Sequence, residues 1–121
     1  SVDLSFNAIV DNTPPWATIQ PLHSPVPGIS ATIKWTGGDA LSGIDHYSFA
    51  ISTNGADYRT LNNNIARTSS SYKFSIAKKQ IIIVALTAYD KSGNQFTAKS
   101  AFYTNGYVFP YSFTFPLIFM E

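Results

Sequence analysis

Cysteine is absent from the sequence, so neither disulfide bonds nor thiol chemistry stabilises the fold or performs a reaction. Charged residues account for only 12% of the chain, and a net charge of +1 provides little electrostatic attraction for nucleic acid. The pair Lys78-Lys79 is interpreted as a solvated turn between strands, since no other basic residue lies directly beside it. We therefore expect no nucleic-acid partner and no thiol-dependent activity.

Long hydrophobic runs are also missing. The apolar stretch near the C-terminus is short and is interrupted by Pro110 and Pro116. A membrane-spanning helix needs about 20 apolar residues in succession. We therefore expect no membrane span in this sequence.

Residue patterns that carry chemistry are sparse. Glycine-rich phosphate loops, zinc-ligand spacings and paired catalytic carboxylates are not found. The local candidate for a hydrolytic site is His46 with Asp39 and Ser42, but turn formation is a sufficient role for the last two. Calcium is the stronger alternative, because Asp39, Asp45 and Asp90 all fall in predicted turns. With only 7 acidic residues in the chain and no clustering among them, we expect no metal, no cofactor and no enzymatic activity.

Aromatic residues, in contrast, reach 15% and apolar residues 45%, a balance that favours a β protein. The length suits one domain with its own core. The central stretch from Ile29 to Trp35 alternates apolar and polar residues with a period of two, which predicts a strand with one buried face. Glycines and polar residues crowd the next seven positions, and alternation resumes from Asp45 through Ile51. A second strand is therefore expected to lie against the first.

Three sequence blocks resemble a known family. Asn12-Thr-Pro-Pro is followed by Trp35-Thr-Gly-Gly-Asp-Ala-Leu-Ser-Gly-Ile-Asp-His-Tyr and then by Ala88-Tyr-Asp-Lys-Ser-Gly-Asn94. In this order they resemble the immunoglobulin-like or fibronectin type III-like modules of exported bacterial and archaeal surface proteins. The resemblance covers roughly residues 11–104. It implies an all-β, antiparallel sandwich of about seven strands, a secreted or cell-surface location, and a non-catalytic role as spacer, adhesive unit or filament subunit.

Alternation and turn signals predict the other strands of this module. Asn54-Gly55 predicts a tight hairpin turn. The proline-containing segment from Pro21 to Gly28 is expected to be a loop, with His23 as an ordinary loop histidine. Three serines and three asparagines are expected to bracket a polar connection. The predicted strands are Trp16–Gln20, 49–53, 58–61, 71–76, 80–89 and 96–104, and the polar connection runs from Asn62 to Ser71.

The predicted strand 80–89 is apolar on both faces. Ile82, Val84, Leu86 and Ala88 share one face, while Ile81 and Ile83 begin the other. Only one face of a sheet meets the core of a sandwich, so we expect the outer face to be covered as well. Ile81 and Ile83 are therefore candidate interface residues.

Both ends of the chain carry strand-like extensions beyond the module. Residues 1–10 alternate apolar and polar side chains without proline, which suits a strand that adds to the sheet of a neighbour. Residues 105–121 place an aromatic or leucine side chain at every second position from Tyr107 to Phe119, a face that would favour aggregation if left in water. Together with Ile81 and Ile83, the candidate subunit-interface residues are Val2, Leu4, Phe6, Ala8, Val10, Phe109, Phe113 and Phe115.

Two non-enzymatic functions fit these features. The first is a structural subunit of an extracellular filament, pilus-like or thread-like, in which the N-terminal strand of one copy completes the sheet of another by donor-strand complementation. The alternative is an accessory, spacer or adhesive module of a larger secreted protein, with the same strand paired inside its own sandwich. A cell-surface carbohydrate is a further candidate partner, with Trp16, Tyr58, Tyr103 and Tyr107 as the aromatic residues nearest to a platform.

Overall fold

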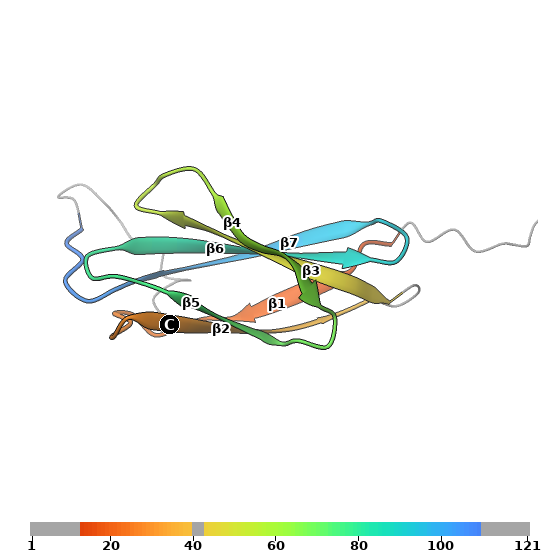
Figure 1. Ribbon diagram of the computed structural model, residues 1–121, viewed down its shortest axis with the longest axis horizontal. Helices are drawn as coiled ribbons and strands as arrows, with labels where there is room; N and C mark the ends of the chain where they lie inside the picture. Colours follow the sequence, from red (N-terminus) through yellow and green to blue (C-terminus); the bar gives the residue numbers. More distant parts are fainter. Residues whose placement is uncertain (1–12, 40–42, 110–121) are drawn as a thin grey trace, which may run out of the picture.

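A computed structural model describes residues 13–39 and 43–109, which form seven strands in two packed sheets (Figure 1). One sheet has the order β1-β2-β5 and the other β4-β3-β6-β7, with every neighbouring pair antiparallel. No helix occurs within the described residues. This arrangement confirms the predicted immunoglobulin-like β-sandwich. The strands are β1 Trp16–Gln20, β2 Ser30–Gly38, β3 Ile44–Thr53, β4 Arg59–Ala66, β5 Ser71–Ser75, β6 Ile81–Asp90 and β7 Gln95–Tyr103.

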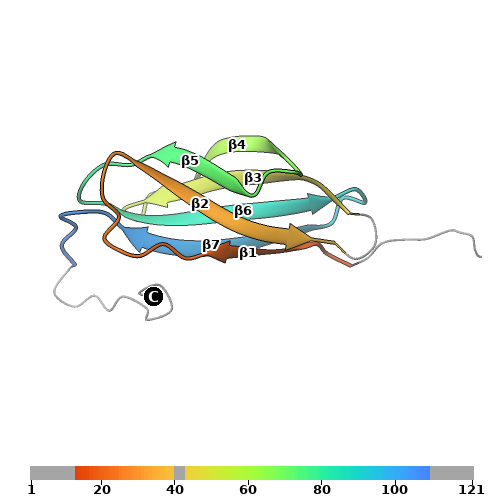
Figure 2. The same ribbon diagram turned by 90° about the horizontal axis from the view of Figure 1, so that it is seen from below.

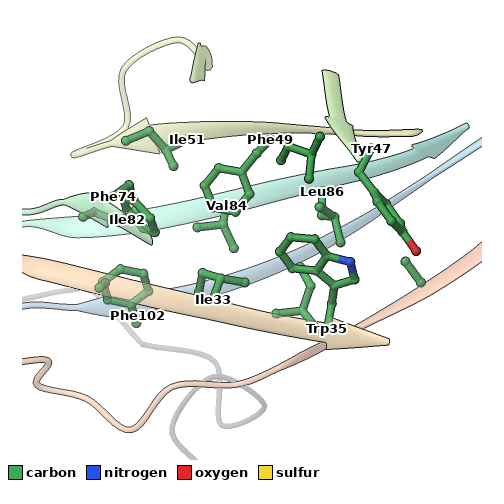
Figure 3. Packing of buried hydrophobic residues seen from close by; sticks show 14 of the residues in the cluster. Ile33, Trp35, Tyr47, Phe49, Ile51, Phe74, Ile82, Val84, Leu86 and Phe102 are labelled. Atoms are coloured by element: carbon green, nitrogen blue, oxygen red, sulfur yellow. The ribbon is translucent and has the colours of Figure 1, made fainter. Parts of the chain in front are cut away.

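Alternation of apolar and polar residues places the core between the two sheets. In β2, Ala31, Ile33 and Trp35 are buried while the polar residues between them face solvent, as a two-residue period requires. Residues from both sheets interdigitate in the centre of the sandwich (Figure 3). The side chains there that are less than 2% exposed include Ile33, Phe49, Ile82, Val84, Leu86 and Phe102.

β2 and β3 lie against each other through their side chains and not through backbone hydrogen bonds. β2 pairs with β1 and β5, whereas β3 pairs with β4 and β6. The connection after Gly38 therefore crosses from one sheet to the other and does not close a hairpin. The alternation identified two strands with buried faces, but faces alone do not determine which strands share a sheet.

The predicted hairpin at Asn54-Gly55 is confirmed. Both residues have positive φ angles, 52° and 80°, as the tight turn between two antiparallel strands requires. The predicted polar connection from Asn62 onwards is wrong, because β4 continues through the three asparagines to Ala66. β4 is an edge strand with register shifts against β3, and such a strand accepts polar residues that a central strand would not.

The two sides of the sandwich differ (Figure 2). On one side β1 packs beside β7, and the loop after β1 adds a single parallel bridge between Val26 and Thr104, with the Val26 N–H donating to the Tyr103 carbonyl oxygen at 2.9 Å. The predicted loop 21–28 is thus confirmed, with this bridge as an unpredicted addition. On the opposite side, β4 and β5 form the free edges of the two sheets.

The described chain enters and leaves the sandwich at opposite ends (Figures 1 and 2). At one end the Asn94 side chain donates to the Thr13 carbonyl oxygen at 3.4 Å. At the other end the Lys79 N–H donates to the Asn105 carbonyl oxygen at 2.8 Å. Because Lys79 and Asn94 flank the two ends of β6, the entry and exit points are separated by about 30 Å, the length of a ten-residue strand.

Candidate interaction surfaces

The outer face of the four-stranded sheet is apolar where the start of β6 lies beside the end of β7. Ile81 pairs with Tyr103 and Ile83 with Ala101, so all four side chains share the face that points away from the core. Ile81 and Ile83 are half-buried, and Ala101 is only 4% exposed. This confirms the predicted division of β6 into two apolar faces. The outer face here is therefore a candidate interaction surface.

The first aromatic residues of the C-terminal extension pack on the end of β7. The Phe109 ring lies 5.0 Å from the ring of Tyr103 and 5.0 Å from that of Tyr107, in both cases edge to face. The Tyr103 and Tyr107 rings lie 6.2 Å apart. Tyr103 also pairs with Ile81 across the sheet. The predicted interface residues Ile81 and Phe109 therefore both lie beside Tyr103, on one apolar surface.

A cation–π contact crosses the same face further along. The Lys99 Nζ atom lies 5.2 Å from the centre of the Tyr58 ring. Tyr58 precedes β4 and Lys99 belongs to β7, so the contact spans the two central strands, where Ala50 pairs with Ala85. The small alanines leave room for this contact over the sheet.

Seven predicted interface residues cannot be placed against this surface. They lie outside the described residues, five in the N-terminal extension and two in the C-terminal one. They are Val2, Leu4, Phe6, Ala8, Val10, Phe113 and Phe115.

A groove between the free edges of β4 and β5 was not anticipated from the sequence. Two adjoining depressions of about 330 and 230 Å³ share Ile51, Arg59 and Ser75 in their walls. Buried apolar side chains form the floor, and the basic side chains of Arg59 and Lys73 stand at the rim. The floor residues are Ile51, Phe74, Ile76 and Ile82. The distance between two sheet edges has no sequence signature, so no residue pattern marked this groove.

The acidic residues considered for calcium are divided between two places. The Asp90 carboxylate, 3% exposed, accepts hydrogen bonds from the backbone N–H groups of Ser92 and Asn94 and from the Asn94 side chain, at 2.9, 2.8 and 3.0 Å. This confirms the interpretation of Asp90 as a turn residue that binds its own backbone. Asp45 instead accepts from the His46 ring at 2.7 Å. Among the described residues, no three acidic or histidine side chains gather so that they could hold a metal ion.

Hydrogen bonding to Asp90 outweighs the effect of its burial. Burial raises the pKa of the carboxyl, but hydrogen bonds with the side chain and backbone of Asn94 lower it. Further hydrogen bonds with Asp39 and with the Ser92 backbone act in the same direction. The pKa of Asp90 is therefore held below its ordinary value, and the ionised form belongs to the folded turn.

The two described members of the local hydrolytic candidate have different partners. His46 stacks on Tyr89 with ring centres 4.5 Å apart and hydrogen-bonds with Asp45, whereas Asp39 interacts with Asp90. Ser42 lies outside the described residues. His23 is exposed in the loop after β1, as expected.

The four candidate carbohydrate-binding aromatics do not form one platform. Trp16 is 51% exposed on the outer face of the three-stranded sheet, where its indole lies over Gly38. Tyr58, Tyr103 and Tyr107 belong to the other side of the molecule, and only the last two rings approach each other. The structure thus brings together only Tyr103 and Tyr107 of the four candidate aromatic residues.

Comparison with known proteins does not assign the chain to a family. No protein-family model and no curated protein matches the sequence. Within residues 13–39 and 43–109, no helix is long and apolar enough to cross a membrane.

Proposed function

We propose that this chain is a non-enzymatic structural subunit of an extracellular filament, in which immunoglobulin-like copies associate head to tail by strand addition. The observation that carries the proposal is that the described chain enters at Thr13 and leaves near Asn105, at opposite ends of the sandwich, which suits linear propagation. The N-terminal extension alternates apolar side chains and has no proline among residues 1–10, so its backbone N–H groups can join a ladder.

Free sheet edges and the apolar outer face supply the surfaces for association. β5 and β4 end their sheets on the same side, and an unpaired edge is a template for an added strand. Burying Val2, Leu4, Phe6 and Val10 contributes on the order of 6–10 kcal/mol before the cost of ordering the segment. Main-chain hydrogen bonds to the sheet edge add to this contribution when the segment pairs.

The same geometry favours a second candidate, a spacer or adhesive module of a larger exported protein. A module whose ends lie about 30 Å apart extends a tandem array with each repeat. The two functions differ in where residues 1–10 pair. Intermolecular pairing belongs to the filament, and intramolecular pairing belongs to the spacer.

Light scattering and negative-stain microscopy of the full chain, beside a version without residues 1–10, test the proposal. We expect the full chain to form fibres and the truncated chain to remain monomeric. Circular dichroism of the truncated chain provides the folding control. Monomers in both samples would overturn the filament function and leave the spacer.

A further inference from the structure

We propose that the groove between β4 and β5 accepts residues 2–10 from a second copy of this chain. The inference rests on the proposed function and names the surface that receives the strand. Four features of the structure and sequence support it: the open side of the sandwich, the direction of the polar groups of β5, the pattern of the incoming segment, and the place of the groove relative to the chain entry.

The sandwich is closed on one side and open on the other. β1 lies beside β7, and the bridge at Val26 also occupies the end of the β7 edge. On the β4–β5 side, the depressions reach the buried floor residues Phe74 and Ile82 (Figure 2 shows the two edges). A strand added on the β4–β5 side would cover this apolar surface. A strand added on the closed β1–β7 side would not.

The backbone of β5 presents hydrogen-bonding groups to this groove. The Ile76 N–H donates to the Ile29 carbonyl oxygen and the Trp35 N–H to the Ser70 carbonyl oxygen, both at 2.9 Å. In an antiparallel register, alternate residues bond to the same neighbour. The N–H and C=O groups of Lys73 and Ser75 therefore point away from β2, towards the free edge, where an incoming strand can bond to them.

Residues 2–10 match the groove in pattern and in charge. Five apolar residues at alternate positions, Val2 to Val10, would face the floor, and nine residues extend to about 30 Å, close to the length of the longest strands, β3 and β6. Residues 1–12 contain Asp3 and Asp11 but no lysine or arginine, whereas Arg59 and Lys73 stand at the rim. The opposite charges favour this acidic segment over a basic one as the occupant of the groove.

The position of the groove favours a second copy over the same chain. The entry of the described chain at Thr13 lies beside Asn94, at the C-terminal end of β6. Gln80 and Ile82, at the N-terminal end of β6, line the groove. Copies arranged head to tail bring the extension of one to the groove of the next without reversing the chain, and each added copy presents a new groove.

Cysteine cross-linking tests the contact directly, because the natural sequence has no cysteine to interfere. A full chain carrying Asn7→Cys is mixed with a full chain carrying Lys73→Cys and treated with a short bis-maleimide, which tolerates a small shift in register. The matched control replaces the acceptor with Thr18→Cys, an exposed position on β1 at the other edge of the same sheet. Thermal unfolding checks that each variant is folded.

We expect cross-linked dimers with Lys73→Cys at a yield about tenfold above the Thr18→Cys control, as pairing at one edge requires. A higher or equal yield at Thr18, in a wild-type chain that assembles, would overturn the groove but leave the filament. A chain that carries both Asn7→Cys and Lys73→Cys and links within a monomer would show that the extension fills its own groove, and would overturn both. Monomers without any cross-link would also overturn both.

Charge reversal provides a second measurement. The double variant Arg59→Glu and Lys73→Glu should weaken association of the full chain by about tenfold, because the rim then repels Asp3 and Asp11. Lys34→Glu, an exposed lysine on β2 outside the groove, is the matched control. Equal effects of the two changes would contradict the groove as the acceptor.

Discussion

The rings of Trp35 and Tyr47 meet edge to face across the core, with centres 5.4 Å apart and planes inclined by 62° (Figure 3). Trp35 belongs to β2 and Tyr47 to β3, so the pair joins the two sheets at the place where the chain crosses between them. Aromatic pairs of this kind contribute about 0.5–1.5 kcal/mol beyond the burial of their area. Gly37, two residues after Trp35 in β2, lies beside the Tyr47 ring.

Gly37 has no room for a side chain because of this arrangement. An added Cβ atom would lie 2.5 Å from the Tyr47 hydroxyl oxygen and 3.1 Å from the Trp16 carbonyl oxygen. We expect Gly37→Ala to lower the free energy of unfolding by about 1–3 kcal/mol, since the buried ring must shift. Chemical denaturation measures the loss.

The double variant Gly37→Ala with Tyr47→Phe identifies the cause of that loss. Removing the hydroxyl removes the closest contact but leaves the Trp16 carbonyl oxygen, so part of the stability should return. Strictly additive losses would show that the hydroxyl is not what the alanine meets.

The buried phenol of Tyr47 should make the protein sensitive to alkali. Burial raises the pKa of Tyr47 above its ordinary value of 10.0. Because the folded pKa is the higher one, the stabilisation is fully present below pH 10.0 and is lost as the pH rises through the folded pKa. The free energy of unfolding, measured by chemical denaturation from pH 8 upwards, should fall more steeply with pH for the wild type than for Tyr47→Phe. Tyr58→Phe, at a ring that is 44% exposed, is the control for removing a tyrosine hydroxyl.

Asp90 should determine part of the response to acid. Its folded pKa is lowered, so its stabilisation is present above the unfolded pKa of about 4 and is lost as the pH falls through the folded value. Asp90→Asn keeps one oxygen for the backbone N–H groups of the turn but cannot ionise. We expect this variant to have a lower free energy of unfolding than the wild type at neutral pH. On acidification it should lose less stability than the wild type does.

The matched control for this experiment is Asp57→Asn, an exposed aspartate before β4. Urea denaturation of the three proteins between pH 7 and pH 2 separates the effects. An acid response of Asp90→Asn equal to that of the wild type would contradict the role of the carboxylate.

Much of the fold was predictable because a two-residue period is a direct consequence of strand geometry. β1 has the predicted bounds, and β6 carries its two apolar faces as expected. Alternation determines which face of a strand is buried, but not its neighbours, and so it did not assign β2 and β3 to different sheets. The extension of β4 through Asn62 was missed because residue preferences for strands are overridden at a sheet edge.

The candidate surfaces were predictable only in part. Ile81 and Ile83 stood out because β6 is more apolar than one buried face requires. The groove between β4 and β5 depends on the separation of two edges that are joined by residues 67–70 but belong to different sheets. Residues in a groove of this kind are also core residues, so their apolar character gives no separate signal in the sequence.

The outer face of β6 can be distinguished from the core by comparing one position on each face. Leu86 is 0% exposed and points into the sandwich, whereas Ile83 is half-buried on the outer face. We expect Leu86→Ala to lower the free energy of unfolding by about 2–5 kcal/mol. Ile83→Ala should lower it by only about 1 kcal/mol, because less apolar area leaves water at this position. Chemical denaturation of both variants measures the contrast, and equal losses would contradict it.

Replacement by lysine tests whether that outer face contributes to association. Ile83→Lys should leave the fold intact and weaken assembly of the full chain, because a charge must then be desolvated in the contact. Thr87→Lys is the matched control on the same strand and face, beyond the apolar cluster and beside Thr97. Light scattering compares the two at equal concentrations. If Ile83→Lys assembles as the wild type does, while the groove variants do not, strand addition alone holds the copies together and the apolar face of β6 serves the fold of its own chain.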